Sequence, residues 1–245
     1  MLTLKNRTCV IAGGTGNIGN QAVRDLLKNG MNVALLSHFP EKCAEIIEDS
    51  KAYPGICAAF GNEPDRKEMF QKIYESFGSI DAYVTKTGIL KEPVPLEEVN
   101  TEELNDLSQK QVCNVFDNIK AILPYLKNSN APRIVLCTTI GSRNGNEKEN
   151  IMDSIVKGAV NSMIYTLARQ LAPYGITVNG ICVSAMIQDH EGDGLNSETM
   201  LMEIPMRRLG TSADFSAALE YLLAEEAGFL SGEILMVNGG MGTGL

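Results

Sequence analysis

The stretch that decides the fold is Val10-Ile11-Ala12-Gly13-Gly14-Thr15-Gly16-Asn17-Ile18-Gly19, close to the beginning of the chain. It joins an apolar run to a segment whose apolar side chains recur every three or four residues, as in an amphipathic helix. Gly14, Gly16 and Gly19 form the pattern G-x-G-x-x-G. Such a loop needs glycine because its backbone must turn tightly and approach a diphosphate closely, while the next helix begins with free N–H groups. The stretch therefore predicts a dinucleotide-binding unit, with a glycine turn that binds nothing as the alternative.

Outward from this stretch, short apolar runs alternate with helical patterns along the whole chain. The runs are 8–12, 32–36, 56–60, 81–85, 133–138, 177–183 and 233–237. Continuous apolarity over about five residues is typical of strands buried on both faces of a parallel sheet. The longer helical patterns are 101–126, 152–171 and 211–226. This alternation predicts an α/β, Rossmann-type fold: a doubly wound, mostly parallel seven-stranded sheet with helices on both faces.

No linker or change of composition divides the chain, so we expect one dinucleotide-binding domain over residues 1–245. The one long irregular stretch, 184–209, follows the carboxyl end of a strand, where α/β sheets bind ligands. It is rich in methionine and aliphatic residues. We interpret it either as a substrate loop that closes over an apolar ligand or as packing around a short helix.

Composition and charge exclude several classes of protein. The 245 residues are 44% apolar and 21% charged, which is ordinary for a globular chain and excludes intrinsic disorder. The net charge of −9 argues against nucleic acid as a partner. The sequence contains neither an apolar run of about 18 residues nor the apolar core of a signal peptide, so we expect a cytoplasmic protein without a membrane segment.

The cysteines and histidines form no recognisable metal or redox motif. The six cysteines include no C-x-x-C pair, and four of them lie in or beside apolar runs, so we expect buried, reduced thiols. The two histidines, His38 and His190, are far apart in the sequence. No metal is expected, because a zinc site needs more nitrogen or sulfur ligands at closer spacing.

Several segments resemble the short-chain dehydrogenase/reductase family. The family's loop, T-G-x-x-x-G-x-G, matches Gly13 and Gly19 and has Asn17 at its middle glycine. Three further segments are similar to parts of the family's pattern: 167–179, 207–214 and 229–240. The resemblance covers nearly the whole chain. Within the family, the sequence most resembles the 3-oxoacyl-[acyl-carrier-protein] reductases.

This resemblance implies a nicotinamide cofactor, NADP or NAD, and a small-molecule substrate with a carbonyl or hydroxyl group. The cofactor contacts that it implies are Gly13, Thr15, Gly16, Asn17, Ile18, Gly19, Ser37, His38, Thr87, Gly88 and Lys157. The family's N-N-A-G segment becomes Thr85-Lys86-Thr87-Gly88, and Phe60 stands where an acid usually contacts adenine.

The end of the second apolar run bears on the choice of cofactor. An acid there would hold the 2′-hydroxyl of NAD, whereas this chain has Leu36-Ser37-His38-Phe39. Ser37 and His38 can hydrogen-bond a phosphate, which favours NADP weakly. The alternative for His38 is a solvated loop residue without a ligand.

The resemblance also implies a set of catalytic positions. The family's tyrosine and lysine are four residues apart, which places them on one face of a helix. Lys157 matches the lysine, but Asp153 stands where the tyrosine is expected. Thr139 falls at the position of the serine that polarises the carbonyl, and Gln111 at that of the asparagine in the proton relay.

Asp153 changes the chemistry that this set can perform. A neighbouring ammonium favours the carboxylate, so we expect Asp153 to be ionised, and an ionised carboxylate cannot donate a proton at neutral pH. It can still serve as a general base, or simply form an ion pair with Lys157. No other tyrosine replaces the missing one: Tyr83 and Tyr165 are predicted to be packed in the core, and Asn150 stands at the position that a tyrosine takes in the enoyl-reductase branch.

Two hypotheses follow. The first is a nicotinamide-dependent oxidoreductase with an atypical or impaired proton donor. The second is a catalytically silent homologue that binds a dinucleotide, or a partner, as a sensor or as a subunit of an assembly. Family members usually associate through two long helices, which correspond here to 101–126 and 152–171, so we expect a homodimer or homotetramer.

Overall fold

A seven-stranded parallel sheet forms the centre of the computed structural model, which describes residues 2–37, 39–61, 65–86, 93–145, 150–184, 186 and 198–242. The strands are β1 (Thr8–Ala12), β2 (Asn32–Leu36), β3 (Cys57–Phe60), β4 (Ala82–Thr85), β5 (Arg133–Thr139), β6 (Thr177–Val183) and β7 (Ile234–Val237). Their order is β3-β2-β1-β4-β5-β6-β7, and every neighbouring pair is parallel. The predicted doubly wound α/β fold is confirmed, and each strand bound lies within one residue of its predicted place.

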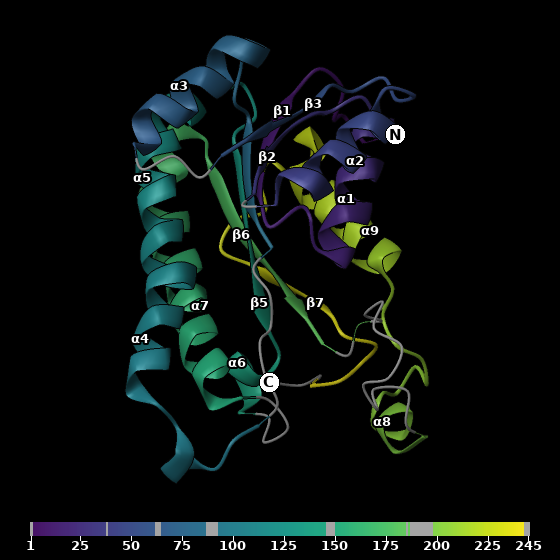
Figure 1. Cartoon of the computed structure of the whole chain (residues 1–245), viewed down its shortest axis with the longest axis vertical. Helices are drawn as coiled ribbons and strands as arrows, with labels where there is room; N and C mark the ends of the chain where they lie inside the picture. Colours follow the sequence, from purple (N-terminus) through teal and green to yellow (C-terminus); the bar gives the residue numbers. More distant parts are fainter. Residues whose placement is uncertain are drawn as a thin grey trace.

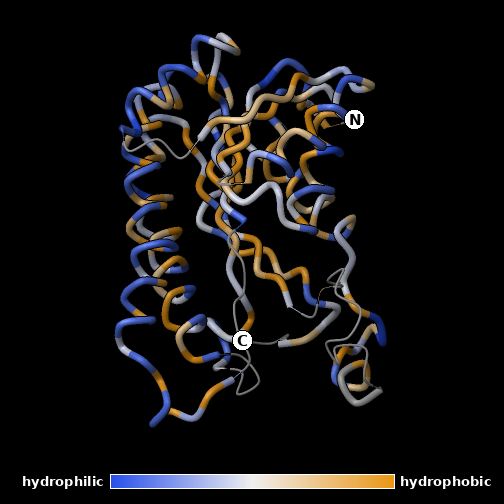
Figure 2. The backbone as a smooth tube through the Cα atoms, in the orientation of Figure 1, coloured by the Kyte–Doolittle hydropathy of each residue, from blue (hydrophilic) through white to orange (hydrophobic). Residues whose placement is uncertain are grey.

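Helices cover both faces of the sheet (Figure 1). One face carries α1 (Asn17–Lys28), α2 (Pro40–Ser50) and α9 (Ser212–Leu223); the other carries α3 (Arg66–Phe77), α5 (Asn114–Leu126) and α7 (Ile151–Leu171). Strand side chains alternate between two cores, with Val33 and Leu35 in one and Ala34 and Leu36 in the other. Burial on both faces explains the continuous apolar runs, and Figure 2 shows the hydrophobic residues gathered along the central strands.

The strand order creates a crevice at one edge of the sheet. β1 lies between β2 and β4, so the connections that leave these strands run to opposite sides. Ala12 is paired with both Leu36 and Thr85. The residues that follow these three strand ends, Gly13, Ser37 and Lys86, are therefore brought to the same edge.

The predicted single helix 101–126 is helical throughout but not uniform. It consists of α4 (Thr101–Ser108), a π-helical turn η2 (Gln109–Cys113) and α5. A π-turn is wider than an α-turn and is frequent at functional sites. The expectation of one regular α-helix was therefore wrong at its middle, because the positions of apolar residues specify a helix but not an extra residue within one turn.

The two other long helices begin as capped helices. Asn150 caps α7, its side-chain oxygen accepting a hydrogen bond from the amide of Met152 at 2.9 Å. Thr211 and Asp214 form a capping box at the start of α9. α9 ends at Leu223 rather than at 226, and the buried guanidinium of Arg133 binds the carbonyl of Ala224 just beyond it (Nε to O, 3.2 Å).

Several short elements complete the described chain. They are η1 (Leu96–Glu98), α6 (Gly141–Asn144), η3 (Ala172–Tyr174), α8 (Glu198–Glu203) and η4 (Glu225–Ala227). α8 lies within the stretch expected to be irregular, 184–209, of which 185 and 187–197 lie outside the described residues. Cys113 is exposed and the other five cysteines are buried, among them the four of the apolar runs. No helix in the described ranges is long and apolar enough to cross a membrane.

Candidate functional site

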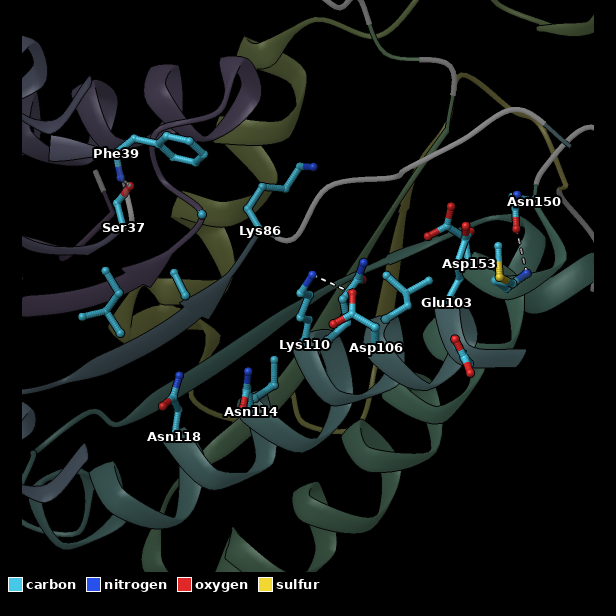
Figure 3. Close-up of a pocket in the computed structure, with 18 of the residues that line it drawn as sticks. Ser37, Phe39, Lys86, Glu103, Asp106, Lys110, Asn114, Asn118, Asn150 and Asp153 are labelled. Atoms are coloured by element: carbon cyan, nitrogen blue, oxygen red, sulfur yellow. Dashed lines mark hydrogen bonds and ion pairs between the residues drawn. The ribbon is translucent and has the colours of Figure 1, made fainter. Parts of the chain in front are cut away.

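A cleft of about 940 Å³ opens at the carboxyl edge of the sheet (Figure 3). Its walls come from the ends of β1, β2 and β4, from one side of α4, η2 and α5, and from the beginning of α7. The lining residues are Ala12, Gly13, Leu36, Ser37, Phe39, Tyr83, Lys86, Asn100, Glu102, Glu103, Asp106, Leu107, Lys110, Gln111, Asn114, Val115, Asn118, Asn150, Met152 and Asp153. The cleft thus joins the predicted glycine loop to two of the predicted catalytic residues.

Contacts with backbone atoms exclude a side chain at two positions of the glycine loop. Gly13 has φ +86°, and a Cβ added there would lie 1.9 Å from the carbonyl oxygen of Lys86. A Cβ on Gly19 would lie 2.5 Å from the carbonyl oxygen of Gly13. At Gly16 the nearest atom is 3.9 Å away, so space does not demand glycine there. Gly13 and Gly19 are therefore required by contacts with backbone, and at Gly14 an added Cβ would lie 2.8 Å from a side-chain carbon of Leu35.

The loop leads into α1 without a side-chain cap. Gly16 is the N-cap residue, so the first amides of α1 are left for a ligand or solvent. Asn17, in the first turn, is exposed and does not have a positive φ, so the left-handed backbone that asparagine tolerates is not used there. Ile18 is buried in the core, so only its backbone is placed to meet a cofactor.

Ser37 ties the loop to the end of β2. Its hydroxyl lies 3.1 Å from the Thr15 hydroxyl and accepts a hydrogen bond from the amide of Phe39 at 3.1 Å. No acid stands at Ser37, so this corner of the cleft presents two linked hydroxyl groups. His38, Thr87 and Gly88 lie outside the described residues, and their cofactor roles stay predictions.

Asp153 and Lys157 lie one turn apart on α7, and each is only 1% exposed. Burial lowers the pKa of Lys157 to about 8; the Lys86 ammonium also lowers it, whereas the Cys137 thiol and the Asp153 carboxylate raise it. The Lys157 ammonium also donates to the carbonyl of Cys137 on β5 at 3.5 Å. Asp153 lines the cleft, and Lys157 lies behind it, outside the lining.

Thr139, the hydroxyl residue predicted at the end of β5, is poorly placed to contact a substrate in the cleft. Thr139 is 1% exposed, lies outside the cleft lining, and its hydroxyl oxygen makes no hydrogen bond with any described residue. Side chains alternate along a strand, so Thr139 continues the side of Cys137, away from α7. Its neighbour Thr138 lies 2.9 Å from the Ser142 hydroxyl, which in turn accepts from Asn161 of α7 at 3.0 Å. The hydroxyl pair next to α7 was not found from the sequence.

Gln111 is buried on the π-turn and lines the cleft, and its catalytic role stays a prediction. Below it, a polar network closes the floor of the cleft. Arg66 binds the side-chain oxygens of Asn114 and Asn118, both at 2.9 Å. Asn118 donates to the Tyr83 hydroxyl at 3.0 Å, and burial raises the pKa of Tyr83 to about 12.

The two alternative tyrosines differ in outcome. Tyr83 is fully buried, as predicted, although it also lines the cleft. Tyr165 is 47% exposed, so its prediction as a core residue was wrong. It lies within an apolar stretch of α7 but on the outer side of the helix, away from the sheet.

Sequence reasoning missed the charged residues of the cleft. Lys86 stands at its centre, and α4 contributes Glu102, Glu103 and Asp106 to one wall. The helical spacing of these acids was visible in the sequence, but nothing in it showed that α4 would face the glycine loop. No group of three or more His, Cys, Asp or Glu side chains in the described part of the chain is arranged to hold a metal ion.

Comparisons with known proteins identify the family to which this fold belongs. A family model described as enoyl-(acyl carrier protein) reductase matches residues 13–242. The chain belongs to the short-chain dehydrogenase/reductase family. Among curated members of the family, it is 28% identical to a 3-oxoacyl-[acyl-carrier-protein] reductase of Staphylococcus epidermidis, over 96% of this chain and 99% of the relative. It is 27% identical to glucose 1-dehydrogenase 2 of Bacillus subtilis, over 97% and 95%.

Solved structures of the short-chain dehydrogenase/reductase family share the fold. A short-chain type dehydrogenase/reductase from Mycobacterium ulcerans superposes with a TM-score of 0.88 at 19% identity, over 98% of this chain and 90% of that one. An NAD⁺-bound xylitol dehydrogenase superposes with a TM-score of 0.86 at 22% identity, over 97% and 100%. Members of this family use NAD or NADP, and the open space at Gly16, together with the uncapped first amides of α1, fits the diphosphate of such a cofactor.

Proposed function

We propose that this chain binds a nicotinamide dinucleotide in the cleft and acts as an oxidoreductase on a small carbonyl or alcohol substrate, with an impaired proton donor. The observation that carries the proposal is the continuity of the cleft, from the glycine loop to Gln111 and Asp153. One cavity can therefore hold a dinucleotide along the strand ends and a substrate against α7.

Each end of the cleft has its own task. The uncapped start of α1 holds the phosphates, and Ser37 contacts the adenosine ribose. The bound cofactor supplies or takes a hydride at the other end. There, Gln111 offers an amide to orient the substrate oxygen.

The proton step is the weak point of the proposed reaction. Reduction of a carbonyl needs a proton donor beside the substrate, and the side chain on the cleft wall at this place is the carboxylate of Asp153. Lys157 holds a proton, but it lies behind Asp153 and outside the lining. Reduction is therefore expected to be slow compared with a family member that carries a tyrosine at this position.

A second candidate function is a catalytically silent dinucleotide-binding protein, a sensor or a subunit of an assembly. The observation that favours it is the burial of the polar groups at the catalytic end. Asp153, Lys157 and Thr139 are each 1% exposed, so little of their surface is open to a ligand. Binding without turnover is the behaviour that distinguishes this candidate.

Two finer points of the proposal concern the cofactor and the assembly. The linked hydroxyls of Thr15 and Ser37, without an acid beside them, favour NADP over NAD. Exposed apolar side chains on α5 and α7, Phe116, Ile155 and Tyr165, favour a homodimer or homotetramer formed through these helices. Residues 184–209 are proposed to form the substrate loop.

The test is a titration of the purified protein with NADH and NADPH, followed by an assay of carbonyl turnover. The chain contains no tryptophan, so the fluorescence of the reduced nicotinamide is observed against a low protein background. Binding with slow turnover supports the oxidoreductase, and binding with none supports the silent homologue. Failure to bind either nucleotide refutes both. Light scattering tests the assembly, and a monomer mass contradicts it.

A further inference from the structure

We propose that Lys86 is a phosphate-binding residue, whose ammonium group holds the diphosphate of the dinucleotide against the glycine loop. The inference rests on the proposed function, since it assumes a dinucleotide in the cleft. It adds a side-chain contact, from the end of β4, to the backbone contacts of the loop.

The first step is the position of the Lys86 backbone. Its amide donates to the carbonyl of Ala12 at 2.8 Å, which extends the pairing of β4 with β1 by one residue. Its own carbonyl oxygen packs directly on Gly13, at the site where a Cβ would lie. The root of the Lys86 side chain is therefore fixed beside the loop that a diphosphate must approach.

The second step is the charge of Lys86 in its setting. The side chain is half-buried and lines the cleft, and no carboxylate among the described residues pairs with it. Lys110, on the opposite wall, is instead paired with Asp106 at 2.6 Å. A partly buried ammonium without a counter-ion attracts an anion more strongly than an exposed or already paired one.

The third step is the reach of the charge. Figure 3 shows the Lys86 side chain extending into the cleft, between the Ser37 corner and the Lys110 wall. Its ammonium also lowers the pKa values of Lys157 and Cys137, which are buried behind the cleft wall. The Lys86 backbone packs on Gly13, at the start of the loop, and in doubly wound folds the diphosphate lies where this loop enters the helix. The 2′-phosphate of NADP belongs at the other corner, near Ser37.

The experiment compares Lys86→Gln with wild type in titrations with NADH, NADPH and ADP-ribose. All three ligands carry the diphosphate, and a charge-assisted hydrogen bond lost to all of them should raise each Kd by about 10- to 100-fold. Lys86→Arg keeps the cation and should remain within about fivefold of wild type. The difference between wild type and Lys86→Gln should shrink as salt is raised, because screening weakens the attraction.

Lys110→Gln is the matched control, because it removes the same charge from the same cleft where Asp106 already neutralises it. We expect its Kd values to change by less than about threefold. Thermal unfolding of each unliganded variant checks that the fold is intact.

Equal affinity of Lys86→Gln and wild type for all three ligands overturns the assignment while leaving dinucleotide binding intact. A loss confined to NADPH also overturns it, because it would place Lys86 at the 2′-phosphate. Wild-type protein that binds none of the ligands refutes the proposed function itself.

Discussion

The two ends of the cleft are held in shape by different means. At the glycine-loop end, backbone packs on backbone: Gly13 lies against the carbonyl of Lys86, and Gly19 against the carbonyl of Gly13. At the catalytic end, buried polar side chains meet: Asp153 and Lys157 act on each other across one helical turn, behind a π-turn that carries Gln111. Steric packing therefore determines the shape of the glycine-loop end, whereas electrostatic interactions determine that of the catalytic end.

This difference shows how a binding site and a reaction can become separable within one fold. A steric requirement allows only glycine at the loop, whatever substrate is used. An electrostatic requirement at the catalytic end can be met by more than one set of charged groups, of which Asp153 with Lys157 is one. Dinucleotide binding should therefore depend on the first end and turnover on the second, and the following predictions test that division.

The largest effect is expected from Gly13→Ala. The new methyl group would lie 1.9 Å from the Lys86 carbonyl oxygen, and φ is +86°. We expect dinucleotide binding to weaken by about 100-fold or more and the free energy of unfolding to fall by about 3 kcal/mol or more. Fluorescence titration and chemical denaturation measure the two.

Gly175→Ala is the matched control for Gly13→Ala. Gly175 has φ +71°, but no atom lies within 4 Å of its added Cβ, so this variant has the backbone strain without the clash. Gly175→Ala should lower the free energy of unfolding by about 1 kcal/mol and leave dinucleotide binding unchanged. If both variants bind the dinucleotide equally well, the loop is not held by backbone packing.

The next effect concerns the proton donor. Asp153→Tyr places a phenol on the cleft wall one turn from Lys157, and it should raise NADPH-dependent reduction of an activated ketone by about 10- to 100-fold. This is less than the full range of general acid catalysis, about 10²–10⁴-fold, because Gln111 and the 85–88 segment remain altered. Steady-state kinetics at saturating cofactor measure the change.

Asp153→Asn separates the two roles of this carboxylate. A residue that only pairs with Lys157 can lose its charge with little effect on any turnover that wild type has. Brisk ketone reduction by wild type, abolished in Asp153→Asn, would instead make Asp153 the working acid–base group and contradict the impaired donor.

A third effect is the pH dependence that Lys157 gives to stability. Its pKa in the folded protein is about 8, below its ordinary value of 10.5. Between these values the unfolded chain holds a proton that the folded chain has released, so raising the pH favours the folded state. Relative to Lys157→Met, the free energy of unfolding of the wild type should rise by up to about 3 kcal/mol between pH 7 and pH 10.5.

Urea unfolding of both proteins at several pH values measures this difference, and the comparison cancels the titration of all other groups. A difference that stays flat or falls with pH would show that Lys157 is not held in a desolvated site. The catalytic end would then be hydrated, and its burial would not account for weak turnover.

The smallest effect is expected from Gly158→Ala, next to Lys157 on α7. No atom lies within 4 Å of the added Cβ, and alanine is the better helix former, so stability should rise by about 0.5–1 kcal/mol. Gly180→Ala on β6 is the contrasting variant, because its Cβ would lie 2.8 Å from Ile164. It should lose stability in the same denaturation experiment.

The sequence was sufficient to predict the strands and the glycine loop, whereas Asp153 and Gln111 were assigned from the family resemblance. The strands and the loop depend on local patterns, namely apolar runs of a given length and glycine spacing. Three details were not predictable in this way. The π-turn at Gln111 changes a single turn within a helix. The exposure of the Tyr165 side chain depends on how α7 is rotated against the sheet. The direction of the Thr139 side chain depends on where β5 ends.

The sequence by itself determined the parallel sheet, its family and the need for glycine at Gly13 and Gly19, because burial and backbone geometry are properties of short segments. Tertiary structure alone decided which charges share the cleft. Lys86 follows β4, Asp106 lies on α4 and Asp153 lies on α7, so their distances follow from how these elements pack against one another. Electrostatic interactions act through space, so it is a consequence of the fold that Asp106 pairs with Lys110 while no carboxylate in the described part of the chain pairs with Lys86.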